Sequence, residues 1–265
     1  MSARDIPNHE CHIFAPRHSR YVLVIPVINE GDRIQRQLKQ IACLDPALDI
    51  AIADGGSTDG SLAPDFLETV GVRALLVKTG PGRLSAQLRM AYAWALDEGY
   101  GGIVTIDGND KDAVEAIPRF LAALDEGYDY VQGSRYARGG RAVNTPLTRH
   151  IAGRLIHAPL LSLAARRWYT DTTNGFRAYS ARYLADPRVQ PFRAVFDRYN
   201  LLFYLTVRAS QLGLRTTEIG VERRYPPAGP VTTKINGMRG YLYMFSELLS
   251  VMLGCCHPER FRPDR

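Results

Sequence analysis

YVLVIPVINEGDRIQRQLKQIACLDPALDIAIADGG, residues 21–56, is the stretch that decides the expected fold. Its outer segments, 21–27 and 48–54, are short apolar runs that contain several β-branched residues, as buried β-strands do. Between them, apolar residues recur at the spacing of one helix face: Ile34, Leu38 and Ile41. This order of strand, helix and strand is typical of two parallel strands joined by a helical crossover.

The same alternation continues to about residue 134. Further apolar runs at 73–78, 101–107 and 128–134 are separated by helical patterns over 84–95 and 113–126. The chain is therefore expected to fold as an α/β protein, with a mostly parallel sheet and helices on both faces.

The pattern changes after residue 134. Two loops, 135–150 and 169–180, flank an expected helix that ends near Trp168, and a later helix leads to a strand over 215–225. No linker divides the chain, so we expect one domain over 20–240, a flexible N-terminal tail over 1–19, and a C-terminal helix and tail over 241–265.

Composition leaves several partners open. The 265 residues are 46% apolar and 23% charged, which fits a globular protein with an ample core. Lys and Arg number 33 against 27 Asp and Glu, and the resulting net charge of +6 suits phosphorylated small molecules, an anionic membrane or nucleic acid. The N-terminus has no apolar segment of signal-peptide length, so a cytoplasmic location is expected.

The cysteines favour no structural role. Four of them, Cys11, Cys43, Cys255 and Cys256, lie at irregular spacings, which predicts free thiols rather than disulfides or a zinc site. The segment HECH at 9–12 lacks the spacing of a helical zinc motif, and we do not expect it to bind a metal.

The most apolar late segment is GYLYMFSELLSVMLGCC, residues 240–256. It is too short to span a bilayer and is interrupted by Glu247. Its apolar residues Leu242, Phe245, Leu249 and Met252 recur at helical spacing, so we expect a helix that either packs on the core or lies on a membrane surface.

Polar residues follow three of the expected strands, where parallel sheets bind their ligands. These residues are Pro26 and Glu30, then Asp54, then Asp107, Asn109 and Asp110. Carboxylates there can accept hydrogen bonds from a nucleoside and can hold a divalent ion. For Asp54, an ordinary turn or helix-cap role is the alternative.

Six motifs in this order, between about residues 20 and 240, resemble those of the family 2 glycosyltransferases of the GT-A fold. VIPVINE and DGGSTDGS are similar to the V-I-P-x-x-N-E and D-D-G-S-x-D-x-T segments, and TIDGNDKDAVEAIP stands in place of the metal-binding D-x-D segment. VQGSRYARGG, DTTNGFRAYS and RRYPPAGPVTTKING are similar to G-S-R-Y-x-x-G-G, D-x-x-S-G-F-R and R-x-x-G-x-S-K. The likeness is closest to the polyprenyl-phosphate (dolichyl-phosphate) sugar synthases, including mannose synthases.

This resemblance implies an inverting transferase that takes a sugar from a nucleotide diphosphate sugar donor. The implied nucleotide contacts are Pro26, Glu30, Asp54, Gly80 and Gly82. Asp107 would hold Mg²⁺ or Mn²⁺, with Asn109 and Asp110 as further ligand candidates. Because Asn109 replaces the second acid of the motif and Lys111 follows it, Asp110 or Asp112 are the acids expected to compensate.

For the acceptor, the resemblance implies a lipid phosphate held by Arg135 and Arg149, while Arg223 and Lys234 reach the phosphates. A lipid phosphate is already an anion and needs no base. A hydroxyl acceptor would need one, and Asp171 is the candidate, with loop ordering as its alternative role. Arg177 contacts either a phosphate or a structural partner.

Other functions stay open. A transferase of cell-surface polysaccharide synthesis would use a glycan hydroxyl as acceptor, and a non-catalytic protein would only bind the sugar nucleotide. A nucleotidyltransferase would carry a G-x-G-T-R-like loop after the first strand, where this chain has PVINEGDR. Nucleic acid is not an expected partner. With a lipid acceptor, the protein would contact the membrane peripherally, at its inner face.

Overall fold

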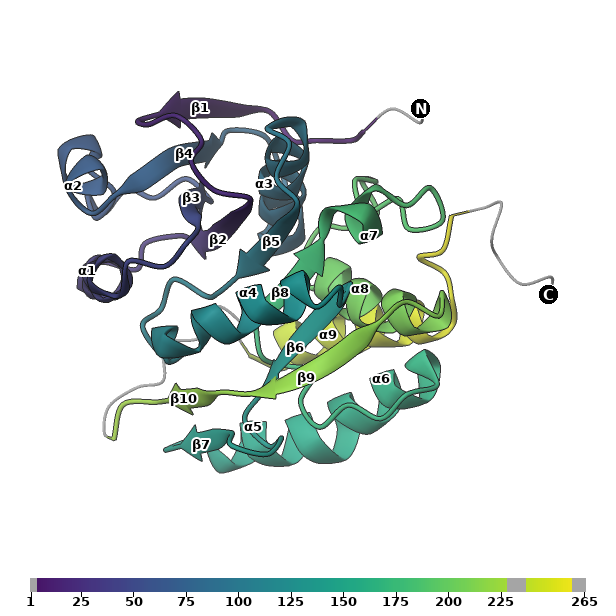
Figure 1. Ribbon diagram of the computed structural model, residues 1–265. Helices are drawn as coiled ribbons and strands as arrows, with labels where there is room; N and C mark the ends of the chain where they lie inside the picture. Colours follow the sequence, from purple (N-terminus) through teal and green to yellow (C-terminus); the bar gives the residue numbers. More distant parts are fainter. Residues whose placement is uncertain (1–3, 228–236, 259–265) are drawn as a thin grey trace.

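The computed structural model describes residues 4–227 and 237–258, and it has the expected α/β architecture (Figure 1). Within these residues, eight strands form one sheet in the order β1-β4-β3-β2-β5-β8-β6-β9. The strands are β1 (His9–Ile13), β2 (Tyr21–Val27), β3 (Asp49–Asp54), β4 (Val72–Lys78), β5 (Gly102–Thr105), β6 (Tyr130–Ser134), β8 (Arg177–Ser180) and β9 (Thr216–Gly220).

The helices lie on both faces of this sheet. They are α1 (Asp32–Leu44), α2 (Pro64–Thr69), α3 (Leu84–Asp97), α4 (Ile117–Asp125), α5 (Leu147–Ala152), α6 (Ala158–Ala165), α7 (Ala181–Ala185), α8 (Asn200–Gln211) and α9 (Gly237–Met252). A short 3₁₀ turn, η1 (Val114–Ala116), precedes α4, and a π-helical stretch, η2 (Gly153–His157), joins α5 to α6.

Alternation along β2 explains how the sheet is covered. Val22 and Val24 pack into a cluster with α3, α6, α8 and α9, while Leu23 and Ile25 pack into a second cluster with α1, α2 and α4. Successive side chains of a strand point to opposite faces, so a continuous apolar run serves both cores. The expectation of helices on both faces is confirmed.

Most of the sheet is parallel, as predicted, but two strands are not. β1 pairs antiparallel with β4 at the edge, and β8 lies antiparallel between β5 and β6. The antiparallel β8 returns the chain from the loop 169–176 into the middle of the sheet. This loop therefore ends next to β5 and β6, whose carboxyl ends face the site.

Three expected boundaries need correction. The N-terminal stretch expected as a tail contributes β1, because His9–Ile13 pairs residue by residue with β4. The helix expected over 113–126 begins with the 3₁₀ turn η1. The strand expected over 215–225 divides at Val221 into β9 and β10 (Glu222–Arg224), and β10 pairs in parallel with β7 (Arg141–Val143) in a separate two-stranded sheet.

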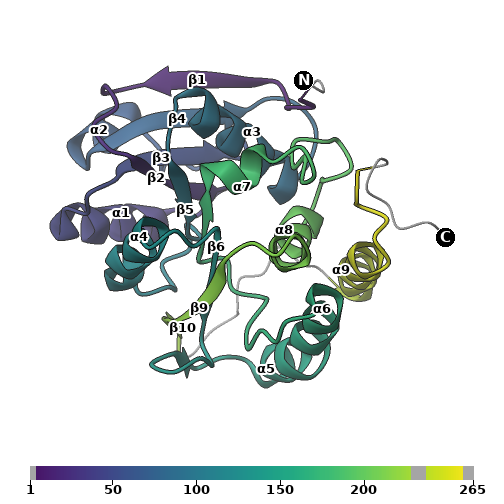
Figure 2. The same ribbon diagram turned by 45° about the vertical axis from the view of Figure 1, so that its right-hand side comes forward.

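The C-terminal helix α9 packs on the core by one face and exposes the other, while contact of the exposed face with a membrane stays a prediction. Leu248 and Val251 are buried against α6 and α8, whereas the predicted stripe residues Leu242, Phe245 and Leu249 are exposed. Figure 2 shows α5, α6 and α9 along one side of the molecule. No helix among the described residues is long and apolar enough to cross a membrane. The four cysteines are free thiols, as predicted.

Candidate active site

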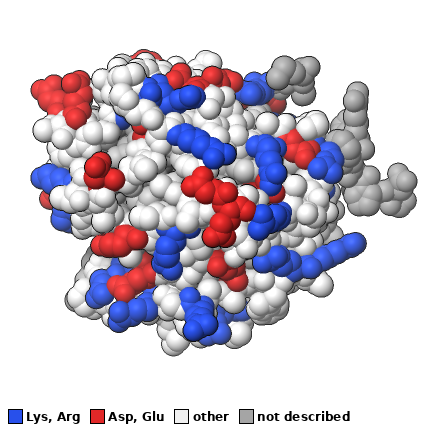
Figure 3. Space-filling model, viewed as in Figure 1, with Lys and Arg blue, Asp and Glu red and all other residues white. Residues whose placement is uncertain are grey.

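A cleft of about 1290 Å³ opens at the carboxyl ends of the parallel strands. One half is formed by the turns after β2, β3, β4 and β5, and the other half by α5, η2, α8, β10 and α9. On the face shown in Figure 3, basic and acidic side chains are intermingled. Inside the cleft the balance differs, because eight Lys and Arg side chains line it against two acids, Glu30 and Asp107. The cleft is therefore suited to an anionic ligand.

Buried glutamines fix the loops at the strand ends. Gln87 of α3 donates to the carbonyl oxygens of Val27 (2.9 Å) and Ala53, at the ends of β2 and β3. Gln37 of α1 donates to the Asp107 carbonyl at 3.0 Å and accepts from the Asp110 amide at 2.9 Å. These side-chain amides satisfy backbone groups that the sheet leaves unpaired and so tie the loops to α1 and α3.

The predicted nucleotide contacts divide into two groups. Pro26, Glu30 and Gly82 line the cleft, whereas Asp54 and Gly80 do not. Asp54 is buried and accepts from the Ser57 amide at 2.9 Å and its hydroxyl at 2.6 Å, and Gly55 is the residue of this turn that faces the cleft. The geometry of Asp54 thus matches the turn role that was its alternative.

Gly82 has a specific reason to be glycine. Its φ of 103° lies in the left-handed region, and a Cβ atom there would overlap the side chain of Ala86 in α3. The chain can therefore turn tightly into α3 at the rim of the cleft. Gly80 packs instead against the N-terminal segment, where its amide donates to Asn8 at 2.8 Å.

Asp107 and Asn109 form the part of the cleft suited to a divalent ion. Asp107 is partly exposed, and the Oδ1 atom of Asn109 is buried and has no hydrogen-bond partner among the described residues. A Cβ atom at Gly175 would clash with the Asp107 carboxylate, so the glycine leaves that group room. An unpaired carboxamide oxygen beside a carboxylate fits Mg²⁺ or Mn²⁺, which prefer oxygen ligands.

The other acids of this loop are engaged elsewhere. Asp110 accepts from Arg36 of α1 at 3.1 Å and does not line the cleft. Asp112 is fully buried and pairs with Arg223. Among the described residues, no group of three His, Cys, Asp or Glu side chains comes together as a metal site.

Arg223 of β10 joins Asp107, which lines the cleft, to the buried Asp112. Its guanidinium pairs with Asp107 at 3.0 Å and with Asp112. Burial opposes the charge of Arg223, but the carboxylates of Asp112 and Asp107 outweigh burial and raise its pKa above the usual value. Arg223 thus stays cationic at the point where Asp107 faces the cleft.

Arg135 is held rigidly by Asp171. Its Nε and Nη2 atoms donate to the two carboxylate oxygens at 2.7 and 3.0 Å, and both side chains are buried. Burial alone would raise the pKa of Asp171, but these hydrogen bonds reverse the effect and lower the pKa. A carboxylate that is this well stabilised is a poor general base.

Arg149, Lys111 and Tyr225 form a less constrained group. Arg149 of α5 contacts the Tyr225 hydroxyl at 3.4 Å, and Lys111 lies 5.1 Å above the same ring. Burial, and then the charge of Arg223, lower the pKa of the Lys111 amine. Lys111 departs from the family motif in sequence, yet a lysine two residues after Asn109 is also a signal for a phosphate contact, and its side chain lines the cleft.

Arg177 supports the loop rather than offering its charge. It is buried and donates to the carbonyl oxygens of Asn174 (2.9 Å), Leu202 (2.6 Å) and Thr172 (2.9 Å). These contacts support the structural role considered for it, with carbonyl acceptors in place of an ion pair, and the side chain also lines the cleft. Lys234, the remaining predicted phosphate contact, lies outside the described residues.

Apolar side chains border the basic part of the cleft. Leu242, Phe245 and Leu248 of α9 face it from one side, and Ile156 of η2 and Phe203 of α8 also line it. Leu147, Ile151 and Leu155 add exposed apolar surface beside the same opening. The cleft therefore offers arginines at its floor and hydrocarbon surface at its mouth.

A family model described as glycosyl transferase family 2 matches residues 22–187. The chain belongs to this family. The match spans β2 to α7 and so includes the turns after β2, β3, β4 and β5 and the segment that carries Arg135. The protein is thus an enzyme of the glycosyltransferase class, as predicted.

Two similar relatives support this assignment. The undecaprenyl-phosphate mannosyltransferase of Micrococcus luteus is 30% identical over 210 residues, covering 76% of this chain and 82% of the relative. The polyprenol monophosphomannose synthase of Mycolicibacterium smegmatis is 29% identical over 205 residues, covering 76% of each chain. The predicted likeness to polyprenyl-phosphate sugar synthases is confirmed.

Among solved structures, the glycosyltransferase resembles the glucosyl-3-phosphoglycerate synthase of Mycobacterium tuberculosis, crystallised with Mn²⁺, UDP and phosphoglyceric acid. The TM-score is 0.64 at 19% identity, and the match covers 92% of this chain and 79% of that chain. At this identity the likeness shows the fold, which is GT-A.

Proposed function

We propose that this glycosyltransferase moves a sugar from a nucleoside diphosphate sugar to a polyprenyl phosphate, with inversion at the anomeric carbon. One observation supports this choice of acceptor: the basic floor of the cleft continues into an apolar mouth formed by α9 and η2. A lipid phosphate has the same two parts, an anionic head and a hydrocarbon tail. Two relatives bear names of undecaprenyl-phosphate and polyprenol-phosphate enzymes, which supports the same acceptor.

In this proposal, the donor lies over the turns after β2, β3 and β4, against Pro26, Glu30 and Gly82. Asp107 and the unpaired Oδ1 atom of Asn109 hold Mg²⁺ or Mn²⁺. When bound, the ion offsets the negative charge that develops on the leaving diphosphate. Arg223 and Lys111 lie beside Asp107 and contribute fixed positive charge to the same diphosphate.

The acceptor phosphate binds Arg149, whose guanidinium has only the Tyr225 contacts among the described side chains. Arg135 adds charge from the wall, and Asp171 acts as its positioning partner instead of as a base. The phosphate oxygen is already a nucleophile and needs only orientation for attack on the face opposite the leaving group. The apolar mouth holds the first prenyl units and brings the protein into peripheral contact with a membrane.

The direct test is transfer of radiolabelled sugar from a panel of nucleoside diphosphate sugars, with Mg²⁺ or Mn²⁺. Undecaprenyl phosphate, a short-chain prenyl phosphate and a glycan are offered as separate acceptors. We expect an organic-soluble glycosyl phosphate whose anomeric configuration, read by NMR, is opposite to that of the donor. Transfer to the glycan alone would refute the lipid-phosphate acceptor.

Arg149→Ala tests the acceptor contact within this assay. A charge-assisted hydrogen bond contributes about 1.5–3 kcal/mol, so the KM for the lipid phosphate should rise roughly 10- to 100-fold while the KM for the donor stays constant. Arg154→Ala is the matched control, because Arg154 is exposed in the neighbouring helical stretch and does not line the cleft. Equal effects of the two substitutions would contradict the role of Arg149.

A further inference from the structure

A second cavity, of about 910 Å³, lies away from the active-site cleft. It is formed where α6, α8 and α9 end and where β9 begins, and it shares no lining residue with the cleft. The cleft meets α8 at its first residues, and this cavity meets α8 at its last. On α8, Phe203 is the last residue that lines the cleft and Arg208 is the first that lines the cavity.

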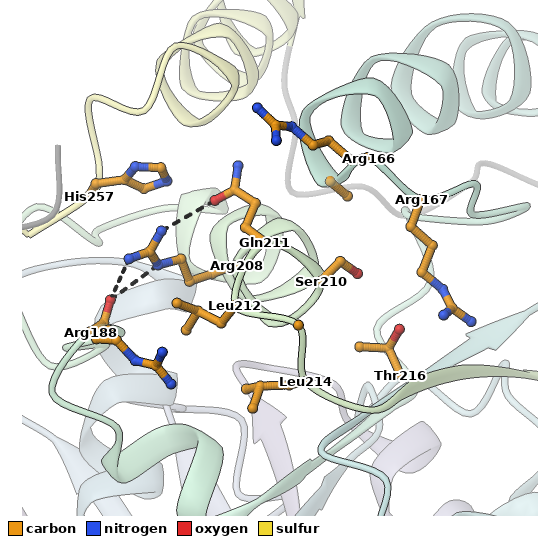
Figure 4. A pocket seen from close by; sticks show the side chains of 12 residues that line it. Arg166, Arg167, Arg188, Arg208, Ser210, Gln211, Leu212, Leu214, Thr216 and His257 are labelled. Carbon is orange, nitrogen blue, oxygen red and sulfur yellow. Dashed lines mark hydrogen bonds between the residues drawn. The ribbon is translucent and has the colours of Figure 1, made fainter. Parts of the chain in front are cut away.

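The lining of this cavity is strongly basic. Four arginines and one histidine contribute to it, and no Asp or Glu does: Arg166, Arg167, Arg188, Arg208 and His257. Figure 4 shows the side chains that line the cavity, with the guanidinium groups of Arg166 and Arg167 directed to different sides of it. Like charges repel when they are brought together without a counter-charge, so this arrangement favours an anionic ligand.

Two of the arginines build the floor. Arg208 is buried and donates to the Arg188 carbonyl oxygen from Nε at 3.1 Å and Nη2 at 3.0 Å (Figure 4). The guanidinium of Arg188 is paired with Asp186 at 2.7 Å. These two side chains therefore have structural partners and shape the cavity.

Arg166 and Arg167 are different. Within the described residues neither forms an ion pair, and the contact found for Arg167 is the Tyr169 ring at 5.8 Å. Both side chains are exposed. Their guanidinium groups are thus available to a ligand with phosphate oxygens, which they fit geometrically.

Helix capping does not account for these two arginines. The last carbonyl groups of α6 accept from other donors: Ala164 from the Gln211 side chain at 3.0 Å, Leu163 from the Arg166 amide and Ser162 from the Arg167 amide, both at 3.2 Å. Arg166 also has a φ of 53°, where glycine is the favoured residue. The two guanidinium groups therefore neither cap the carbonyl groups at the end of α6 nor relieve the positive φ of Arg166.

The surroundings of the cavity indicate where its ligand comes from. Leu163 is 74% exposed, Trp168 is 66% exposed, and Leu253, just before the cavity wall at His257, is 77% exposed. Exposed leucine and tryptophan beside arginine are typical of surfaces at the headgroup level of a membrane. Leu163 belongs to α6, Trp168 follows α6 and Leu253 follows α9, and Figure 2 shows these two helices side by side.

We propose that the surface around this cavity contacts the headgroups of anionic phospholipids, with Arg166 and Arg167 each meeting phosphate oxygens. This inference rests on the lipid-phosphate acceptor proposed above. The contact would hold the apolar mouth of the cleft against the bilayer that contains the acceptor. It is a second membrane contact, separate from the binding of the acceptor itself.

The test is flotation of the whole chain with vesicles of phosphatidylcholine, with and without phosphatidylglycerol, at fixed salt. We compare the wild type with the Arg166→Ala/Arg167→Ala double variant and with Arg20→Ala/Arg215→Ala. The control pair removes the same charge from exposed positions near the end of α4, where the contacts are Asp125 and the Glu126 carbonyl.

We expect the cavity variant to lose affinity for phosphatidylglycerol vesicles by roughly tenfold or more, because each basic residue near an anionic surface contributes to binding. The control should lose much less, and both variants should melt close to the wild type. An equal loss in both variants would refute the cavity as a site, since it would show attraction by net charge alone. Binding of inorganic phosphate without a preference for anionic vesicles would refute the lipid source.

Activity separates this proposal from the proposed function. With a soluble short-chain prenyl phosphate, the cavity variant should turn over like the wild type, and only transfer to vesicle-borne acceptor should fall. Absence of transfer in every protein would count against the proposed function while the flotation result still decides on the headgroup site. Loss of turnover with the soluble acceptor in the cavity variant alone would contradict a site that acts only through the membrane.

Discussion

His157 is a buried histidine that should make the stability of the fold depend on pH. It lies in η2 with Nδ1 2.7 Å from the Thr172 hydroxyl and its ring against Phe203. Burial, with the nearby charge of Arg177, lowers the pKa of His157 to about 4 from 6.5. Below pH 6.5, His157 is protonated in the unfolded chain but stays neutral in the folded chain until the pH falls to about 4. Acid therefore lowers the free energy of unfolding.

We therefore predict that lowering the pH from 7 to 5 costs the wild type about 2 kcal/mol of unfolding free energy through His157 alone. Denaturant unfolding of wild type and His157→Gln at both pH values measures this difference. The variant should lose about 2 kcal/mol less than the wild type, and His9→Gln, at an exposed histidine, should behave as the wild type does. If His157→Gln kept the full acid sensitivity, the neutral buried imidazole would be the wrong explanation.

Residue types at strand ends could be predicted from the sequence, but their hydrogen bonds could not. Asp107, Arg135 and Arg149 all line the cleft, as expected from motifs. Asp54 and Asp110 have the right residue type at the right distance in sequence, yet Ser57 and Arg36 engage their carboxylates. Which of several neighbouring acids faces a ligand depends on the local turn, as for Asp54 with Ser57, or on a distant partner, as for Asp110 with Arg36. The residue types of a linear motif do not specify these contacts.

At the scale of elements, the spacing of apolar residues predicted where helices form better than it predicted which of their faces are buried. The spacing of Leu242, Phe245 and Leu249 indicates a helix correctly, but Leu248 and Val251 form the face that packs on the core. The spacing of apolar residues predicts that a helix has an apolar face, but it does not show what that face packs against. The strand β1 was missed because its residues, HECHI, are all exposed and pair only along one edge.

Helix α9 also carries a prediction, because its exposed face borders the cleft. Phe245 is 44% exposed and faces the apolar mouth, so Phe245→Asp should raise the KM for a long-chain lipid phosphate by roughly tenfold or more, given the 1.5–3 kcal/mol for burying such a side chain. Turnover with a short-chain prenyl phosphate should change little. Leu44→Asp at the end of α1, where Leu44 is 38% exposed, is the matched control. A loss in Leu44→Asp as large as that in Phe245→Asp would show that the apolar mouth is not involved.

At the scale of the whole molecule, alternation of strand and helix was enough to predict the layers, while strand order was not predictable in this way. β8 lies between β5 and β6 and antiparallel to both, although 42 residues separate the end of β6 from the start of β8. Pairing at this separation depends on packing across the sheet. That same placement brings the loop with Asp171 beside Arg135, so this ion pair follows from a strand pairing that sequence periodicity cannot reveal.

Donor binding should be visible in the stability of the whole fold. A ligand present at 100 times its Kd adds about 2.7 kcal/mol, which for a chain of this size raises the Tm by roughly 5–10 °C. We predict that one nucleoside diphosphate gives such a shift, that Mn²⁺ or Mg²⁺ increases it, and that Asp107→Asn removes the metal-dependent part.

Two further substitutions locate the ion in the same thermal-shift measurement. Asn109→Asp should lower the metal concentration needed for the shift, because a carboxylate binds a hard cation more strongly than a carboxamide does. Asp110→Asn is the matched control and should leave the metal dependence unchanged, since Asp110 is turned toward Arg36. A metal dependence that disappears in Asp110→Asn and is unaffected in Asn109→Asp would place the ion on the other side of this loop, against α1, and would overturn the ligand set proposed for the cleft.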